Sequence, residues 1–248
     1  MLRDMRARSC LAVLLLASAA FTQDDGDLVS KSELVHEIPA DKSHPAPRKV
    51  IAAQEGDISC QPTSQTILVV HYRAQSTSQF SMNDDRLVVA LKQSDKFRIL
   101  KVLESDTTIV DDALISETDF DEEFIAVGGM HFLYIRTNFS GSGHGVLDDV
   151  YTISSDGKLS TISFEDVRNS KLLKAQDELR NGGYLLQKGV FTFESGVYKE
   201  PDGECCPSSG VFHAQFRLVG EFREDPNKHV FEPDFKFVVE KEWRSNDR

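Results

Sequence analysis

The feature that most constrains the fold of this chain is a succession of short runs rich in Val, Ile, Leu, Phe and Thr, which begins after Ile58. Clusters of Ser, Asn, Asp and Gly separate these runs. Runs of this length and composition, with turn residues between them, are typical of β-strands. The sequence therefore predicts strands at residues 66–73, 86–92, 97–103, 107–115, 123–129 and 131–139.

The later part of the chain carries the clearest strand signals. Residues 150–164 read as a hairpin, because Asp156-Gly157 supplies the positive φ that a tight two-residue turn requires. Residues 211–218 alternate strictly, with Phe212 and every second residue after it facing one way. Residues 234–243 read as a closing strand.

One segment, residues 164–181, has the pattern of an amphipathic surface helix. Ser163 is placed to cap its start, and Asn181-Gly182 provides a left-handed stop. Its apolar residues fall on one arc of a helical wheel and would pack on a sheet; they are Phe164, Val167, Leu172, Ala175 and Leu179. We therefore expect a mainly β fold, an antiparallel sandwich or barrel-like domain with one surface helix.

The N-terminal residues have the layout of an export signal. A basic start with Arg3, Arg6 and Arg8 precedes an apolar run and the small residues of 17–20, which predicts a signal peptide at 1–22. The apolar run is shorter than the ~20 residues that a membrane-spanning helix needs. Residues 23–53 are polar and carry three prolines, so we expect a disordered or extended leader. Residues 54–248 remain for a single globular domain.

The formal net charge of −12 bears on the partners of this protein. An acidic protein is repelled by nucleic acid and by anionic lipid. We therefore expect no nucleic-acid partner. The signal pattern predicts an exported protein, periplasmic or extracellular, and the lack of a long apolar run predicts no membrane span.

After signal removal three cysteines remain: Cys60, Cys205 and Cys206. Exported proteins meet oxidising conditions, so we expect at least one disulfide. A bond from Cys60 to Cys205 or Cys206 would close a long loop, and a bond between the adjacent cysteines would restrain only a turn. We favour the long-range bond and keep both pairings open.

Thiol chemistry at the adjacent cysteines is the weaker interpretation. Redox catalysts use a Cys-x-x-Cys pair at a helix start, and Glu204 would raise the pKa of a neighbouring thiol. Adjacent cysteines also lack the spacing of a structural zinc site. We therefore expect the cysteines to act as a structural fastener.

A glycine-rich loop at residues 140–149 gathers catalytic residue types. It carries Ser140, Ser142, His144 and Asp148, a hydroxyl nucleophile, a base and a carboxylate. Residues this close together on a glycine-rich loop lack the separate rigid supports of a Ser-His-Asp triad. We favour a flexible connection between strands, and keep Ser142, His144 and Asp148 as candidate catalytic residues.

An acidic run at residues 117–124 is a second candidate for a metal ion, besides the cysteines. Asp119, Asp121 and Glu123 alternate, which puts three carboxylates on one side of an extended chain. The glycine and the distant glutamate of an EF-hand loop are not in register. Solvated charges on an edge strand are therefore the favoured interpretation.

We see no complete catalytic motif and no cofactor fingerprint. The expected function is therefore that of an exported, non-catalytic β-domain, which binds an unknown protein or a cell-envelope component. The alternative is a hydrolase that uses loop 140–149 with His131, His144 or His213 as its base.

Overall fold

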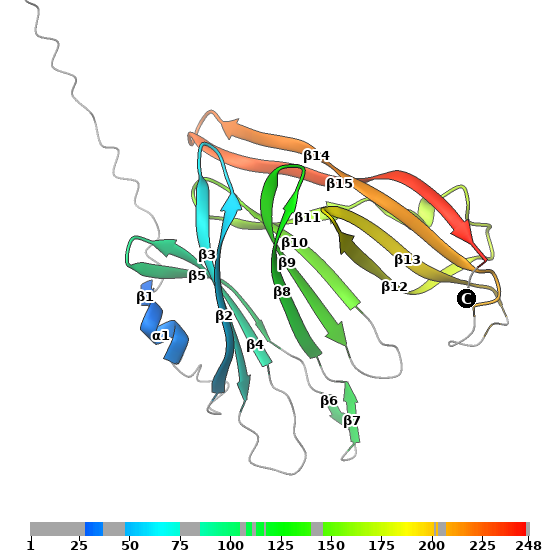
Figure 1. The fold of residues 1–248 in the computed structure, drawn as a ribbon, viewed down its shortest axis with the longest axis horizontal. Coiled ribbons are helices and arrows are strands. Elements are labelled where there is room, and N and C mark those ends of the chain that lie inside the picture. The colour runs from blue at the N-terminus through cyan, green and yellow to red at the C-terminus, as the bar shows by residue number, and fades with distance from the viewer. Residues whose placement is uncertain are drawn as a thin grey trace, which may run out of the picture.

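A computed structural model describes residues 28–36, 48–74, 85–104, 108–110, 113–116, 118–139, 146–200, 202 and 207–246. The fold is mainly β, as the sequence predicts, and consists of a five-stranded sheet, an eight-stranded sheet and a two-stranded hairpin (Figure 1). Each large sheet keeps two edge strands in the described part of the chain, so neither closes into a barrel.

The five-stranded sheet has the order β1-β5-β4-β3-β2 and is antiparallel throughout. Its strands are β1 (Leu28–Ser30), β2 (Arg48–Ser59), β3 (Ser64–Ala74), β4 (Asp85–Gln93) and β5 (Lys96–Glu104).

The eight-stranded sheet has the order β12-β13-β14-β15-β11-β10-β9-β8. Its only parallel pair is β11 with β15, where Phe164 lies opposite Phe237. Its strands are β8 (Thr118–Val127), β9 (Met130–Phe139), β10 (Val146–Ile153), β11 (Leu159–Phe164), β12 (Glu178–Gln187), β13 (Val190–Tyr198), β14 (Val211–Asp225) and β15 (Val230–Ser245).

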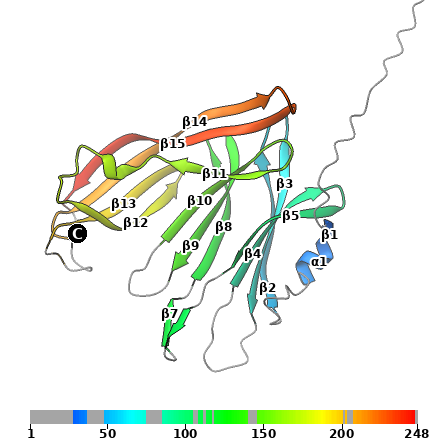
Figure 2. The same cartoon turned by 180° about the vertical axis from the view of Figure 1, so that it is seen from behind.

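Strands β8 to β10 form the middle layer of the molecule, because each of their two faces contributes residues to a hydrophobic core. One face packs on the five-stranded sheet, in a core that includes Val69, Leu87, Leu133 and Tyr151. The other face packs against β13 to β15 of the same sheet. The eight-stranded sheet therefore curls over itself, and Figure 2 shows the long β14–β15 ribbon passing over the middle layer.

Two short elements were not expected in the part of the chain that we assigned to a leader. Strand β1 pairs with β5, and α1 (Lys31–His36) packs Leu34, 1% exposed, on the outer face of the five-stranded sheet. Ser30 and Glu33 begin α1 with reciprocal bonds: the hydroxyl of Ser30 accepts the Glu33 N–H at 3.2 Å, and the Glu33 carboxylate accepts the Ser30 N–H at 2.6 Å. This is a capping box. Residues 28–36 and 48–53 thus belong to the fold, and residues 1–22 lie outside the described part.

The predicted hairpin at 150–164 is confirmed, with a longer turn. Strands β10 and β11 pair up to Ile153 and Leu159, and residues 154–158 connect them. Gly157 has φ +82°, and its N–H donates to the carbonyl of Ser154 at 2.9 Å. The run at 107–115, read as one strand, is instead the short hairpin of β6 (Thr108–Val110) and β7 (Ala113–Ser116).

The prediction of a helix at 164–181 is wrong. Phe164 ends strand β11, a short 3-10 helix, η1, covers Val167–Asn169, and Leu179 already belongs to β12. The Phe164 ring stacks on Phe237 with ring centroids 4.6 Å apart, a contact that a helix starting at Phe164 would break. Helix propensity is a weak determinant, and tertiary packing overrides it here.

Asn181-Gly182, which the sequence predicted to end a helix, has a different role. Residues 181 and 182 form a bulge in β12, between Arg180 and Gly183. A Cβ atom on Gly182 would lie 2.3 Å from Cζ of Phe193, so the bulge needs a residue without a side chain.

Among the residues that the structure describes, no helix has the length and apolar composition of a membrane span.

Candidate functional site

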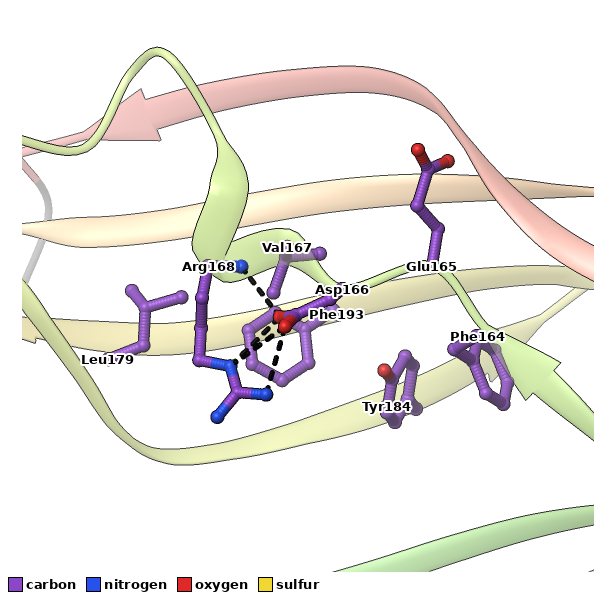
Figure 3. Close-up of a pocket in the computed structure, with 8 residues that line it drawn as sticks. All are labelled: Phe164, Glu165, Asp166, Val167, Arg168, Leu179, Tyr184 and Phe193. Atoms are coloured by element: carbon purple, nitrogen blue, oxygen red, sulfur yellow. Dashed lines mark hydrogen bonds and ion pairs between the residues drawn. The ribbon is translucent and has the colours of Figure 1, made fainter.

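A cavity of about 330 Å³ lies where β11 leads into the η1 turn and faces β12 and β13 (Figure 3). The chain leaves the sheet here because the Asp166 carboxylate accepts the N–H of Arg168 at 3.0 Å and caps the short helix. The cavity is lined by Phe164, Glu165, Asp166, Val167, Arg168, Leu179, Tyr184 and Phe193. Its volume is within the range of sites for small ligands.

The apolar part of this lining is aromatic and fixed in place. The Tyr184 ring lies between Phe164, at 4.1 Å between centroids, and Phe193, at 5.2 Å. Leu179 and the buried Val167 complete the apolar lining. Because these rings pack on one another, the shape of the cavity is set before any ligand arrives.

The charged residues of the lining are already paired. Arg168 donates from Nε and Nη2 to both carboxylate oxygens of Asp166, over 2.9 to 3.2 Å, as the dashed lines in Figure 3 show. These bonds from Arg168 hold the pKa of Asp166 below its usual value. The Glu165 carboxylate accepts the N–H of Val239 at 2.8 Å. An ionic ligand would therefore have to compete with pairs inside the protein.

The Tyr184 hydroxyl is different, since it makes no hydrogen bond with any residue that the structure describes. Burial, with smaller effects from Asp148 and Asp166, raises the pKa of Tyr184 to about 12. The hydroxyl therefore keeps its proton at neutral pH and can donate it to a ligand.

Asp148, a candidate catalytic residue, instead holds the edge strand β12 in position. Its side chain is 1% exposed and accepts the backbone N–H of Tyr184 at 3.1 Å. It also accepts the Tyr134 hydroxyl and the Arg136 Nε–H, the latter at 2.9 Å, while Arg136 donates to the Tyr184 carbonyl. The side chains of Asp148 and Arg136 thus make hydrogen bonds with the N–H and the carbonyl of Tyr184. On an open edge strand these groups could pair with another strand.

The other members of the predicted catalytic loop, Ser142 and His144, lie outside the described residues. Of the other histidines that we considered as a base, His131 lies at the start of β9, whereas the loop follows the end of β9. The described part of the chain therefore brings neither His131 nor His213 to Asp148.

His213 lies in a cluster that sequence reasoning missed. Its Nε2 is 3.0 Å from the Ser245 hydroxyl, and its Nδ1 is 3.5 Å from the Glu194 carboxylate. Its ring stacks on Trp243 at 5.0 Å. Glu194, His213 and Trp243 are opposite one another on β13, β14 and β15, and on β13 Glu194 alternates with Phe193. The alternation at 211–218 predicted an outward His213, but nothing in the sequence gave the register of its partners.

The cysteine prediction is corrected at Cys60. This residue is a buried free thiol at the end of β2, so its expected bond to Cys205 or Cys206 is not formed. Cys60 lies in the β2–β3 turn, whereas β13 ends and β14 begins at the far end of the molecule, near the C-terminus (Figure 1). Cys205 and Cys206 themselves lie outside the described residues, and so does any bond between them.

The acidic run lies on the edge strand β8. Asp121 and Glu123 are exposed, and Asp121 accepts the side-chain amide of Asn138 at 3.0 Å. The side chain of Asp119 is outside the described part. Among the residues that the structure describes, no group of three or more His, Cys, Asp or Glu residues could hold a metal ion.

We compared the chain with protein-family models, curated proteins and solved structures. No protein-family model, curated protein or solved structure matches the chain.

Proposed function

We propose that this protein is an exported binding domain that holds a small, largely apolar ligand in the cavity between η1, β12 and β13. One observation carries the proposal: the cavity has walls of packed aromatic rings, charged residues that are paired within the protein, and the Tyr184 hydroxyl, which makes no hydrogen bond with the described residues. Ligand sites of this kind are mostly apolar, with a few placed polar groups that fix orientation. The N-terminal signal pattern supports export.

The test is binding of N-phenyl-1-naphthylamine, a neutral probe whose fluorescence rises in apolar surroundings. Leu179→Trp would fill the cavity, and Leu172→Trp is its matched control, because Leu172 is 42% exposed and does not line the cavity. We expect saturable binding to the wild type and to Leu172→Trp, and none to Leu179→Trp. Equal binding by both variants would refute the proposal.

A second candidate function, hydrolysis, is favoured by the cluster of Glu194, His213 and Ser245. A serine, a histidine and a carboxylate on three strands have the order of contacts that activates a serine nucleophile. In this mechanism His213 takes the proton of Ser245 as the oxygen attacks an ester carbonyl, and Glu194 orients the ring. The C–O bond to the alcohol then breaks, His213 gives its proton to the departing alcohol, and water hydrolyses the acyl-serine with His213 again as the base.

A fluorophosphonate probe tests this second candidate. It should label the wild type and the control Ser163→Ala, and fail to label Ser245→Ala. Labelling that persists in Ser245→Ala excludes Ser245 as the nucleophile. Labelling that disappears only in Ser142→Ala would return the activity to loop 140–149.

A further inference from the structure

The Tyr184 hydroxyl defines the chemistry of the ligand that the cavity would take. We infer that this hydroxyl donates a hydrogen bond to an acceptor on an uncharged ligand, such as the carbonyl oxygen of a ketone, ester or amide attached to an apolar body. This inference rests on the binding function proposed above and deepens it.

The position of the hydroxyl is fixed from two sides. The backbone of Tyr184 is bonded by Asp148 at its N–H and by Arg136 at its carbonyl. Its ring is held by Phe164, 4.1 Å away between centroids, and by Phe193 and Phe216, at 5.2 Å and 5.6 Å. A donor that is already ordered loses little conformational entropy when it binds an acceptor.

The hydroxyl acts as a donor to the ligand. Burial and the two nearby carboxylates, Asp148 and Asp166, disfavour the tyrosinate, so the proton stays on the oxygen at neutral pH. A ligand that fills the cavity would cover this half-buried hydroxyl, and leaving it unpaired there would be unfavourable, which gives a ligand with an acceptor an advantage over a plain hydrocarbon.

The same electrostatic environment selects against an anionic ligand. Burial is the main cause of the raised pKa of Tyr184, and the charges of Asp148 and Asp166 add to it. A carboxylate ligand beside the hydroxyl would lose its hydration and lie near the same two charges. The lining has two carboxylates, Glu165 and Asp166, and one cation, Arg168, which is bonded to Asp166. An uncharged acceptor avoids this repulsion.

The size of the cavity sets the body of the ligand. The cavity volume of about 330 Å³ is at the lower end of the range for small-ligand sites. A two-ring aromatic compound is of comparable size and can stack on the rings of Phe193 and Tyr184.

Three probes that share one apolar body test the inference: 2-acetylnaphthalene, 2-naphthoate and 2-ethylnaphthalene. 2-Acetylnaphthalene presents an uncharged acceptor, 2-naphthoate presents an anion, and 2-ethylnaphthalene has no acceptor. Their dissociation constants are measured by equilibrium dialysis with the wild type and with Tyr184→Phe, which keeps the ring and removes the hydroxyl.

We expect the wild type to bind the ketone most tightly. Tyr184→Phe should weaken ketone binding by about three- to tenfold, as for loss of one hydrogen bond, and leave 2-ethylnaphthalene unchanged. An unchanged affinity for the ketone in Tyr184→Phe, or tightest binding of 2-naphthoate, would overturn the inference. Failure of all three probes, together with N-phenyl-1-naphthylamine, would overturn the proposed function itself.

Discussion

The carboxylate of Asp148, on β10, accepts the backbone N–H of Tyr184, on β12, at 3.1 Å. These strands are not neighbours in the sheet order, so a side chain makes the link that strand pairing does not. The bond closes the curled part of the eight-stranded sheet beside the cavity. Asp148 therefore connects the stability of the fold to the position of the proposed ligand-binding tyrosine.

Replacing Asp148 with Asn should destabilise the protein by about 2–4 kcal/mol. The change removes a buried charge and leaves Arg136, 27% exposed, without its ionic partner. Urea unfolding followed by circular dichroism measures this loss.

Asp121→Asn is the matched control for this variant. Asp121 is exposed on β8, so the change should stay within about 0.5 kcal/mol of the wild type. Equal stability of the two variants would show that the Asp148 network does not support the fold.

Gly56→Ala should be destabilising by about 1–3 kcal/mol, because it overpacks the contact between the two sheets. A Cβ atom at residue 56 would lie 2.5 Å from Cγ of Phe124. Gly183→Ala is the control, since a Cβ atom there meets nothing within 4 Å. Thermal unfolding compares them, and a Gly56→Ala variant as stable as Gly183→Ala would contradict the packing described here.

The pH dependence of stability should carry a contribution from Asp177. Burial, the largest influence, raises the pKa of Asp177, but the Lys174 N–H and the Arg244 guanidinium, at 3.0 and 2.7 Å, more than offset it and lower the pKa overall. The contribution is therefore fully present above the unfolded-state pKa of about 4 and is lost as the pH falls through the lower folded-state pKa.

Asp177→Asn reveals this contribution. The stability difference between wild type and variant, from urea unfolding, should be largest at neutral pH and should shrink below about pH 4. A difference that stays constant from neutral pH to strongly acidic pH would contradict the assignment.

The thiol of Cys60 should react slowly while the protein is folded. Burial raises its pKa, which lowers the fraction of reactive thiolate. In a Cys205→Ser/Cys206→Ser variant without residues 1–22, Cys60 is the only cysteine. Its reaction with Ellman's reagent should be on the order of a hundredfold slower in the folded than in the unfolded protein, since it requires local opening. Equal rates would show that Cys60 is exposed.

The sequence predicted the strands where side-chain alternation and turn chemistry agree. Phe212, Ala214 and Phe216 are buried as the period of 211–218 requires, and Gly157 takes the positive φ expected in its turn. Both signals are local, because a strand period of two and a left-handed glycine depend on neighbouring residues alone.

Two helix predictions failed for the same reason: the helix predicted at 164–181 is absent, and helix α1 was not predicted. At 164–181, Phe164 reaches the core in one strand and Leu179 in another, because they pair with Phe237 and Val197 on β15 and β13. Leu172 and Ala175, which the helical wheel placed on the same face, are exposed. In the leader, the capping residues Ser30 and Glu33 were present, but Leu34 has a surface to cover only after the five-stranded sheet forms. Long-range packing decides both segments.

The candidate site could not be predicted from the sequence, also because its residues meet through long-range packing. Tyr184 reaches Phe164 through the curl of the sheet, and Asp148 meets Tyr184 across strands that do not pair. Asp148 attracted attention as part of a catalytic pattern, although its contacts are those of a structural residue. Strand register, which no local motif encodes, also brought Glu194, His213 and Ser245 together.

The most direct test of the binding proposal is a ¹³C-methyl NMR titration of the protein with N-phenyl-1-naphthylamine. Val167 and Leu179 line the cavity, whereas Leu133 lies between the two sheets and Leu68 under α1. The account predicts saturable shifts of the methyl signals of Val167 and Leu179, with those of Leu133 and Leu68 unmoved. Shifts at Leu133, with Leu179 unaffected, would place the ligand between the sheets and contradict the account.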